Sequence, residues 1–199
     1  MSVVEQDLGS TDGLSGSPLH RLRELQREAS TESALTFFDS LPPVTVEEML
    51  GSWKGSELRT GHELDGLLEA YGWHGKRYDS ADEAHPLVFE GKNGLFSGNP
   101  LFAPMGLLAR HGQKFLKAPI RRAGRPLVRL GTTGKPKARL RMIEYRGVVS
   151  GTMSYDALPI NDHFRRVDDT TMLGVMDLRG MAQPYFFVLE LESDSATTT

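Results

Sequence analysis

The chain has 199 residues, of which 39% are hydrophobic and 25% are charged, with a formal net charge of −3 and no cysteine. This is the composition of one ordinary globular domain with enough apolar residues to build a core. The lack of cysteine excludes disulfides, thiolate chemistry and cysteine-ligated metal sites. Without an apolar run of membrane length or a signal-peptide pattern, the sequence predicts a soluble, cytoplasmic protein.

The two ends of the chain differ in composition from its middle. Residues 1–17 are rich in Gly, Ser and Asp and poor in apolar residues, so we expect them to be disordered. Together with a marginally helical stretch they form a predicted N-terminal tail over residues 1–30. A single domain is expected over residues 31–192, and the polar residues 193–199 are expected to form a loose tail.

Two helices are predicted at the start of this domain. The first begins at Thr31 and ends before the proline pair at 42–43, because the residue before a proline disfavours the helical conformation. Residues 45–48 read Thr-Val-Glu-Glu, which is the spacing of a capping box, and they predict a short helix through Leu50.

Residues 51–55, which follow this helix, read Gly-Ser-Trp-Lys-Gly. Two glycines on either side of a large aromatic residue suit a tight bend of the backbone around a buried indole. We therefore assign a structural role to Gly51, Trp53 and Gly55, with Trp53 closing one end of a small β-barrel.

The middle of the chain mixes a helix, two strands and a loop. The capping-box spacing recurs at residues 60–63 and predicts a helix of about ten residues that ends at Gly72. Strands are predicted at residues 73–78 and 85–90. Residues 91–112 are rich in Gly and Pro yet apolar, and we expect them to fold over the mouth of a cavity as a lid.

From residue 126 onward the sequence has the pattern of β-structure. Strands are predicted at 127–130, 138–143, 148–155, 160–167, 172–178 and 185–191. Short strands at regular spacing predict an antiparallel meander or barrel. The predicted fold class is therefore mainly β (α+β), a single antiparallel β-barrel with N-terminal helices.

Positive charge is concentrated in residues 110–146, which contain twelve basic residues and one acidic residue. Such a stretch could attract anions or form a docking edge. We favour a solvated connection with charged outward faces of strands. Phe115 and Tyr145 are the only aromatic residues in it, which disfavours a nucleic-acid partner.

Three stretches resemble a known family. Residues 51–55, residues 60–77 and residues 145–177 are similar to the small bacterial and fungal GXWXG family and to the domain of unknown function that follows it. The resemblance assigns residues 33–95 to the GXWXG part and residues 126–191 to the C-terminal strand part. It implies a calycin-like or lipocalin-like barrel that holds an apolar small molecule, and it implies no particular reaction. Haem barrels of the nitrobindin type carry a longer glycine motif, so their haem ligand is not transferred.

The densest group of polar residues is Tyr155, Asp156, Asp162, His163 and Arg165. In the predicted strand, His163 and Arg165 share one face. Asp162 could orient the His163 imidazole, which titrates near neutral pH and could act as a general base. Tyr155 could stabilise a developing oxyanion. A salt-bridge network at the strand ends, including Asp156, is an equally weighted interpretation.

A second group of candidates lies near residue 74. His74 and Lys76 alternate on one strand face, so both could point into the barrel, and His74 is a further candidate for proton transfer. A buried lysine could act as a base or as a Schiff-base nucleophile, although an exposed Lys76 is favoured. Trp73, Tyr145 and His62 are the remaining candidates for contact with a ligand.

Two functions stay open at this point. The first is an enzyme without a cofactor that acts on an apolar or aromatic small molecule by acid–base chemistry of the lyase, isomerase or dehydratase type. The second is a carrier or sensor of a fatty-acid-like ligand. Haem or metal binding ranks third, because the sequence has no H-x-H or H-E-x-x-H spacing. No cofactor and no membrane partner are expected, and a homodimer is an option.

Overall fold

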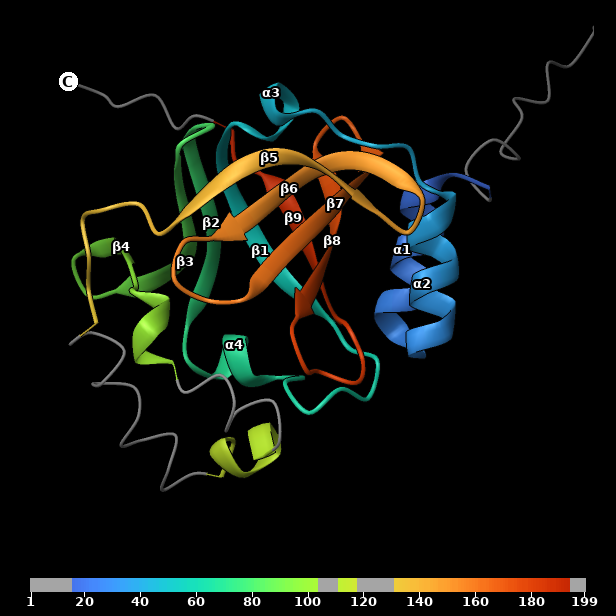
Figure 1. Cartoon of the computed structure of the whole chain (residues 1–199). Helices are drawn as coiled ribbons and strands as arrows, with labels where there is room; N and C mark the ends of the chain where they lie inside the picture. The colour runs from blue at the N-terminus through green and yellow to red at the C-terminus, as the bar shows by residue number, and fades with distance from the viewer. Residues whose placement is uncertain (1–15, 104–110, 118–130, 194–199) are drawn as a thin grey trace, which may run out of the picture.

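The computed structural model of the chain describes residues 16–103, 111–117 and 131–193. The strands in these residues form one antiparallel sheet in the order β2-β1-β9-β8-β7-β6-β5-β3-β4, with a further pairing of β2 with β3. This pairing closes the nine-stranded sheet into a ring, and β4 extends it beyond β3 (Figure 1). The prediction of a mainly β, antiparallel architecture is confirmed.

The elements have the following bounds. The strands are β1 Gly51–Leu58, β2 Trp73–Ser80, β3 Glu83–Gly91, β4 Gly94–Ser97, β5 Ala138–Tyr145, β6 Val148–Tyr155, β7 Ile160–Asp168, β8 Thr171–Leu178 and β9 Tyr185–Leu191. The helices are α1 Pro18–Arg27, α2 Thr31–Ser40, α3 Val46–Met49, α4 Leu67–Ala70 and the 3-10 turn η2 Pro100–Phe102. Helices α3 and α4 lie near opposite ends of the ring (Figure 1).

Helices α1 and α2 form an outer layer on one flank of the ring (Figure 1). Leu22 and Leu25 of α1 and Phe38 of α2 are buried in one apolar cluster with the outward-facing residues of the ring. These outward residues are Leu58, Val167, Leu173, Val175, Phe186 and Val188. Residues 18–27, which the sequence predicts only as a marginally helical tail, are thus anchored to the sheet by their leucines.

Local capping explains where the early helices begin. At α3 the Thr45 hydroxyl accepts from the Glu48 N–H at 3.3 Å, and a Glu48 carboxylate oxygen accepts from the Thr45 N–H at 2.7 Å. The capping box predicted at residues 45–48 is therefore confirmed. At α2 the cap is Ser30, which exchanges the same pair of bonds with Ser33.

The helix predicted from the second capping-box spacing ends before Gly72 as expected, but its predicted start is wrong. The Asp65 carboxylate accepts from the N–H groups of Thr60, Gly61 and His62 at 2.8–3.0 Å, and it folds this segment into a turn. Helix α4 consequently begins only at Leu67. A side chain that satisfies three backbone donors outside a helix competes directly with helix formation.

Alternate residues of the strands line the interior of the ring. In β7, Ile160 and Phe164 pack in the inner apolar cluster, whereas Val167 packs in the outer one. Because successive side chains of a strand point to opposite faces, Asp162 faces inward together with Phe164. The inner and outer clusters lie on the two sides of the same strand, so both faces of β7 are buried.

The ring closes through one narrow seam. Strands β3 and β5 pair at the single register position Ala84 with Ala138. Backbone bonds from Lys137 N–H to Ala84 O (3.0 Å) and from Leu140 N–H to Ala81 O (2.8 Å) support it. The neighbouring β5–β6 pair, by contrast, extends over the whole length of both strands.

Some predictions fall outside the described residues. These are the strand at 127–130, residues 1–15 and 194–199 of the two tails, and part of the apolar stretch 91–112, of which the described part contains β4 and η2. Within the described part of the chain, no helix is both long and apolar enough to span a membrane.

Candidate functional site

The inner wall of the ring carries a buried ion pair. Lys76 Nζ lies 2.8 Å from Asp162 Oδ2, and the side chains are 4% and 1% exposed. Lys76 Nζ also donates to the Pro86 carbonyl at 3.1 Å. Lys76 is on β2, Pro86 on β3 and Asp162 on β7, so the bond joins two separate parts of the ring. The preference for an exposed Lys76 is wrong.

Aromatic rings surround the Lys76 ammonium. Its Nζ lies 4.8 Å from the Phe187 ring centroid and 5.9 Å from those of Trp73 and Tyr155. Ring faces at these distances attract a cation. The lysine therefore has a carboxylate, a carbonyl and three aromatic neighbours to stabilise its charge in the interior.

The environment perturbs the acidic groups of this cluster. Burial raises the pKa of Asp162, against the opposing effects of the Lys76 charge and of hydrogen bonds from Lys76 and Tyr155. Burial and the nearby Asp162 charge raise the pKa of Tyr155 and of Tyr78 well above the usual value for tyrosine. Both tyrosines are therefore neutral hydroxyl groups over the whole physiological range, able to donate and to accept.

Three buried polar atoms of the cluster have no hydrogen-bond partner among the described residues. They are Asp162 Oδ1, the Tyr78 hydroxyl oxygen and Trp73 Nε1. Leaving such a group without a partner costs about 1–3 kcal/mol, and more for a charged group. A small molecule with matching polar atoms would recover this free energy, which makes these atoms the strongest indication of a binding site.

An irregularity in β2 explains why Trp73 and Lys76 share the inner face. The register of β2 against β3 shifts on both sides of Gly75. A Cβ on Gly75 would lie 1.9 Å from the Trp53 carbonyl oxygen, so this close approach requires glycine. The extra residue reverses the alternation, and His74 consequently points away from Lys76. The prediction that His74 and Lys76 both point inward is therefore wrong.

His74 instead lies between two carboxylates outside the inner cluster. Its Nδ1 is 3.3 Å from Glu90 Oε1 and its Nε2 is 2.8 Å from Glu192 Oε1. Asp156 is also remote from the cluster, because it is exposed and pairs with Arg139 at 2.9 Å. Neither residue contacts Lys76 or Asp162.

His163 and Arg165 share one face of β7, as the alternation predicts, but this face is the outer one. The His163 ring stacks on Tyr145 with centroids 3.9 Å apart, and its Nδ1 is 2.9 Å from the Thr152 hydroxyl. Burial, reinforced by the Arg165 charge, lowers the pKa of His163 to about 4. An imidazole held neutral beneath the outer layer cannot serve a ligand inside the ring. The expected Asp162–His163 dyad does not form, because the two side chains point to opposite faces of β7.

Arg165 is fully buried on the same outer face. Its guanidinium lies 4.8 Å from the Phe38 ring centroid and donates to the Tyr145 carbonyl at 3.2 Å. These contacts tie β7 to helix α2 and to β5. Tyr145 and Arg165, both expected to contact a ligand, instead hold the outer layer in place.

The three residues of the Gly-Ser-Trp-Lys-Gly motif have packing roles. Trp53 lies in the inner cluster, where its indole N–H donates to the Met49 carbonyl at 2.7 Å, at the end of the ring near α3. Gly51 has φ 120°, in the region that favours glycine. Gly55 lies under the Trp73 ring, with no room for a Cβ.

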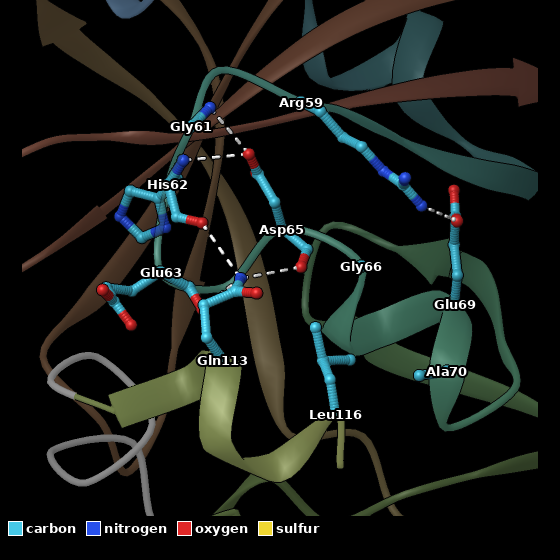
Figure 2. Close-up of a pocket in the computed structure, with 10 residues that line it drawn as sticks. All are labelled: Arg59, Gly61, His62, Glu63, Asp65, Gly66, Glu69, Ala70, Gln113 and Leu116. Atoms are coloured by element: carbon cyan, nitrogen blue, oxygen red, sulfur yellow. Dashed lines mark hydrogen bonds and ion pairs between the residues drawn. The ribbon is translucent and has the colours of Figure 1, made fainter. Parts of the chain in front are cut away.

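A separate polar cleft of about 700 Å³ lies at the end of the ring near α4. Figure 2 shows Asp65 and Gln113 bonded to backbone groups of its own walls and an Arg59–Glu69 ion pair at its rim. His62 is committed in the same way: its Nδ1 accepts from the Leu64 N–H at 3.1 Å, so Nε2 carries the proton and donates to the Gln183 carbonyl at 3.2 Å. Burial lowers the pKa of His62. These mutual bonds favour a structural role for the cleft.

A metal site from His62, His74, His163 and a carboxylate is not assembled by the fold. His62 lies in the cleft, His74 lies beside Glu192, and His163 lies on the outer face of the ring against Tyr145. In residues 16–103, 111–117 and 131–193, no group of three or more His, Asp or Glu side chains is arranged to hold a metal ion.

The sequence identifies part of the inner cluster and misses the rest. Asp162, Tyr155, Lys76 and Trp73 are predicted candidates that the structure brings together. Tyr78 and Phe187 are additional members. Tyr78 was recognisable as two residues beyond Lys76 on the same strand face. Phe187 gave no signal, because it belongs to a continuous apolar run without alternation.

Comparison with known proteins supports the resemblance seen in the sequence. Two family descriptions match in the expected order: GXWXG protein over residues 36–94, and domain of unknown function (DUF4334) over residues 136–190. A crystal structure of a protein from Thermomonospora curvata has 30% sequence identity and a TM-score of 0.63, and the match covers 87% of this chain and 99% of that chain. No curated protein matches this chain.

Proposed function

This chain belongs to the GXWXG family, whose matching descriptions state no activity, and we propose from its own side chains that it binds a small, largely apolar molecule inside the ring. In this proposal the ring is a calycin-like barrel. The Lys76–Asp162 pair, Tyr155 and Tyr78 hold the polar group of the ligand. The surrounding apolar residues of the inner cluster contact its remaining atoms.

The observation that carries this proposal is the set of buried atoms without a partner among the described residues, Asp162 Oδ1 and the Tyr78 hydroxyl in particular. A purely structural ion pair is stabilised best when each remaining lone pair and proton is bonded. Two of the three Lys76 N–H groups have partners, Asp162 and the Pro86 carbonyl, whereas Oδ1 of Asp162 has none among the described residues.

The two tryptophans provide an internal test. The indole N–H of Trp53 is bonded to the Met49 carbonyl, whereas that of Trp73 has no partner among the described residues. In a proton–nitrogen correlation spectrum, addition of 2-naphthylmethanol should shift the Trp73 indole signal strongly and the Trp53 signal weakly. Trp73→Phe assigns the signals. Failure of the Trp73 signal to move at saturating probe would contradict binding inside the ring.

A second candidate function is proton transfer on the bound molecule, of the lyase, isomerase or dehydratase type and without a cofactor. The observation that favours it is the contact of Asp162 with the neutral Tyr155 hydroxyl. The carboxylate would take a proton from the ligand, the Tyr155 hydroxyl would return one at another atom, and the proton on Asp162 would then pass to the Tyr155 oxygen, which restores both groups. Because His163 and His74 point away from the interior, neither has a part in this version of the reaction.

Deuterium exchange separates the enzyme from the carrier. A ligand that co-purifies is first identified by native mass spectrometry and is then incubated with the protein in D2O. Wild-type enzyme should incorporate deuterium at the carbon that loses the proton, and Asp162→Asn should not. A ligand that binds and gains no deuterium identifies a carrier.

A further inference from the structure

We propose that the interior selects an uncharged ligand with a hydroxyl group and rejects a carboxylate, with Asp162 as the residue that determines this choice. The inference rests on the proposed binding function and names the ligand class for that site. It replaces the fatty-acid-like ligand expected from the sequence with an alcohol or phenol of similar apolar character.

Charge balance is the first argument. Lys76 and Asp162 neutralise each other at 2.8 Å, and the other buried cation among the described residues, Arg165, is on the outer face. A ligand carboxylate would therefore enter a neutral site as an uncompensated anion. Burying an unpaired charge carries a large desolvation penalty, which a neutral hydroxyl does not incur.

A second buried carboxylate adds to this bias. Glu57, in β1, accepts from the N–H groups of Gly66, Leu68 and Glu69. Its bonds are with backbone donors, which carry no full positive charge to offset an additional anion. Among the described residues the ring thus contains two buried carboxylates and one inward-facing cation.

Hydrogen-bond chemistry is the third argument. Asp162 Oδ1 is an acceptor without a partner among the described residues, so it requires a ligand that donates. A hydroxyl donates to this oxygen and can accept from Tyr78 or from the remaining N–H of Lys76 with the same atom. A carboxylate has no proton to offer and repels Oδ1. The hydroxyl therefore satisfies both kinds of orphaned atom, and the carboxylate satisfies only the donors.

The role of Asp162 follows from the same arrangement. Asp162→Asn keeps the size of the side chain but leaves the Lys76 charge without its partner. The variant site is then positive, and a carboxylate becomes the ligand that neutralises it. We expect the preference to be reversed by this single substitution. Asp156→Asn is the matched control, because Asp156 is exposed and pairs with Arg139 outside the cluster.

The experiment compares 2-naphthylmethanol with 2-naphthoate by isothermal titration calorimetry at pH 7.5. Wild type and Asp156→Asn should bind the alcohol at least about tenfold tighter than the carboxylate. This ratio corresponds to a difference of about 1.4 kcal/mol in binding free energy. Asp162→Asn should bind the carboxylate tighter. A wild-type preference for naphthoate, or an unchanged ratio in Asp162→Asn, overturns the inference and leaves the binding function standing. If neither probe binds wild-type protein, the binding function and the inference both fail.

A second measurement needs no variant, which matters if Asp162→Asn does not fold. Naphthoate binding to wild type should take up about one proton, because one of the two carboxylates must be protonated to share the site. Titrations in two buffers with different ionisation enthalpies measure this number, and the alcohol should give zero. Naphthoate binding without proton uptake would overturn the inference.

Discussion

The Trp73 indole lies directly over the α-carbon of Gly55: a Cβ built on Gly55 would fall 2.1 Å from Trp73 Cη2. The second glycine of the family motif therefore exists to admit a tryptophan from the neighbouring strand. This contact positions one of the rings that surround Lys76, so the motif and the inner cluster are parts of one packing arrangement.

The first prediction concerns this contact. Gly55→Ala should destabilise the fold by about 1–3 kcal/mol or more, because the added methyl group overpacks a buried region. Urea unfolding measures the change. Gly134→Ala is the control, because a Cβ there meets nothing within 4 Å. Adding Trp73→Leu to Gly55→Ala should restore part of the loss; a double variant no more stable than Gly55→Ala would show that the ring is not the obstacle.

The second prediction concerns the buried ion pair. Lys76→Met should cost about 3–5 kcal/mol at pH 7.5, because it leaves the Asp162 carboxylate buried without a cation. Burial already raises the pKa of Asp162, and removing Lys76 raises it further. A carboxyl group whose pKa is higher in the folded state than in the unfolded state stabilises the folded state at low pH. This stabilisation is lost as the pH rises through the folded-state pKa. The cost should therefore shrink at pH 5.

Urea unfolding at the two pH values tests this dependence. The double variant Lys76→Met with Asp162→Leu should recover most of the stability at pH 7.5, since apolar residues of similar volume replace a buried pair at little cost. Exposed Lys135 provides the control variant, Lys135→Met. An equal loss at pH 5 and 7.5 would show that the Asp162 charge is not the cause.

The third prediction concerns His163. Its pKa is about 4 in the folded protein, against an ordinary value of 6.5, so the unfolded chain binds the proton more tightly. The resulting stability is fully present above pH 6.5 and is lost as the pH falls towards 4. The loss is at most about 3 kcal/mol. His163→Phe keeps a ring on Tyr145, and its stability should fall less between pH 7 and 4 than that of wild type. Parallel curves would exclude this assignment.

The fourth prediction concerns helix α1. Leu25 is 2% exposed in the outer cluster, so Leu25→Ala should cost about 2–5 kcal/mol. Leu101→Ala, at a residue that is 57% exposed, should change the stability little. Thermal unfolding of the two variants tests whether α1 belongs to the cooperative domain. Equal stabilities would return residues 18–27 to the status of a tail.

Local patterns predicted much of this fold. The strand boundaries at residues 148–155 and 185–191 agree with β6 and β9, and the capping box at 45–48 forms as expected. Each of these signals lies within a few consecutive residues. The helix start predicted at residues 60–63 is wrong because Asp65, just beyond the motif, binds the N–H groups of this segment.

The facing of β7 could not be predicted from the sequence. Alternation assigns a side to each residue only if one face is apolar and the other polar. In β7 both faces are buried and both carry polar residues: Asp162 is on the inner face, and His163 and Arg165 are on the outer face. The pattern therefore does not show which face points inward. The position of His74 was unpredictable for another reason: a bulge at Gly75 depends on the backbone of Trp53, a contact between two strands.

The seam between β3 and β5 bears on how a ligand could reach the interior of the ring. Strands β3 and β5 are joined by one register pair, so they can separate locally when few backbone hydrogen bonds break, while the other strands of the ring stay paired. Pro86 follows this point in β3, and its carbonyl holds the Lys76 ammonium. Brief opening of the seam would thus loosen the lysine and expose the aromatic rings around it together, and under the proposed binding function it would give the ligand a side entrance that requires no global unfolding.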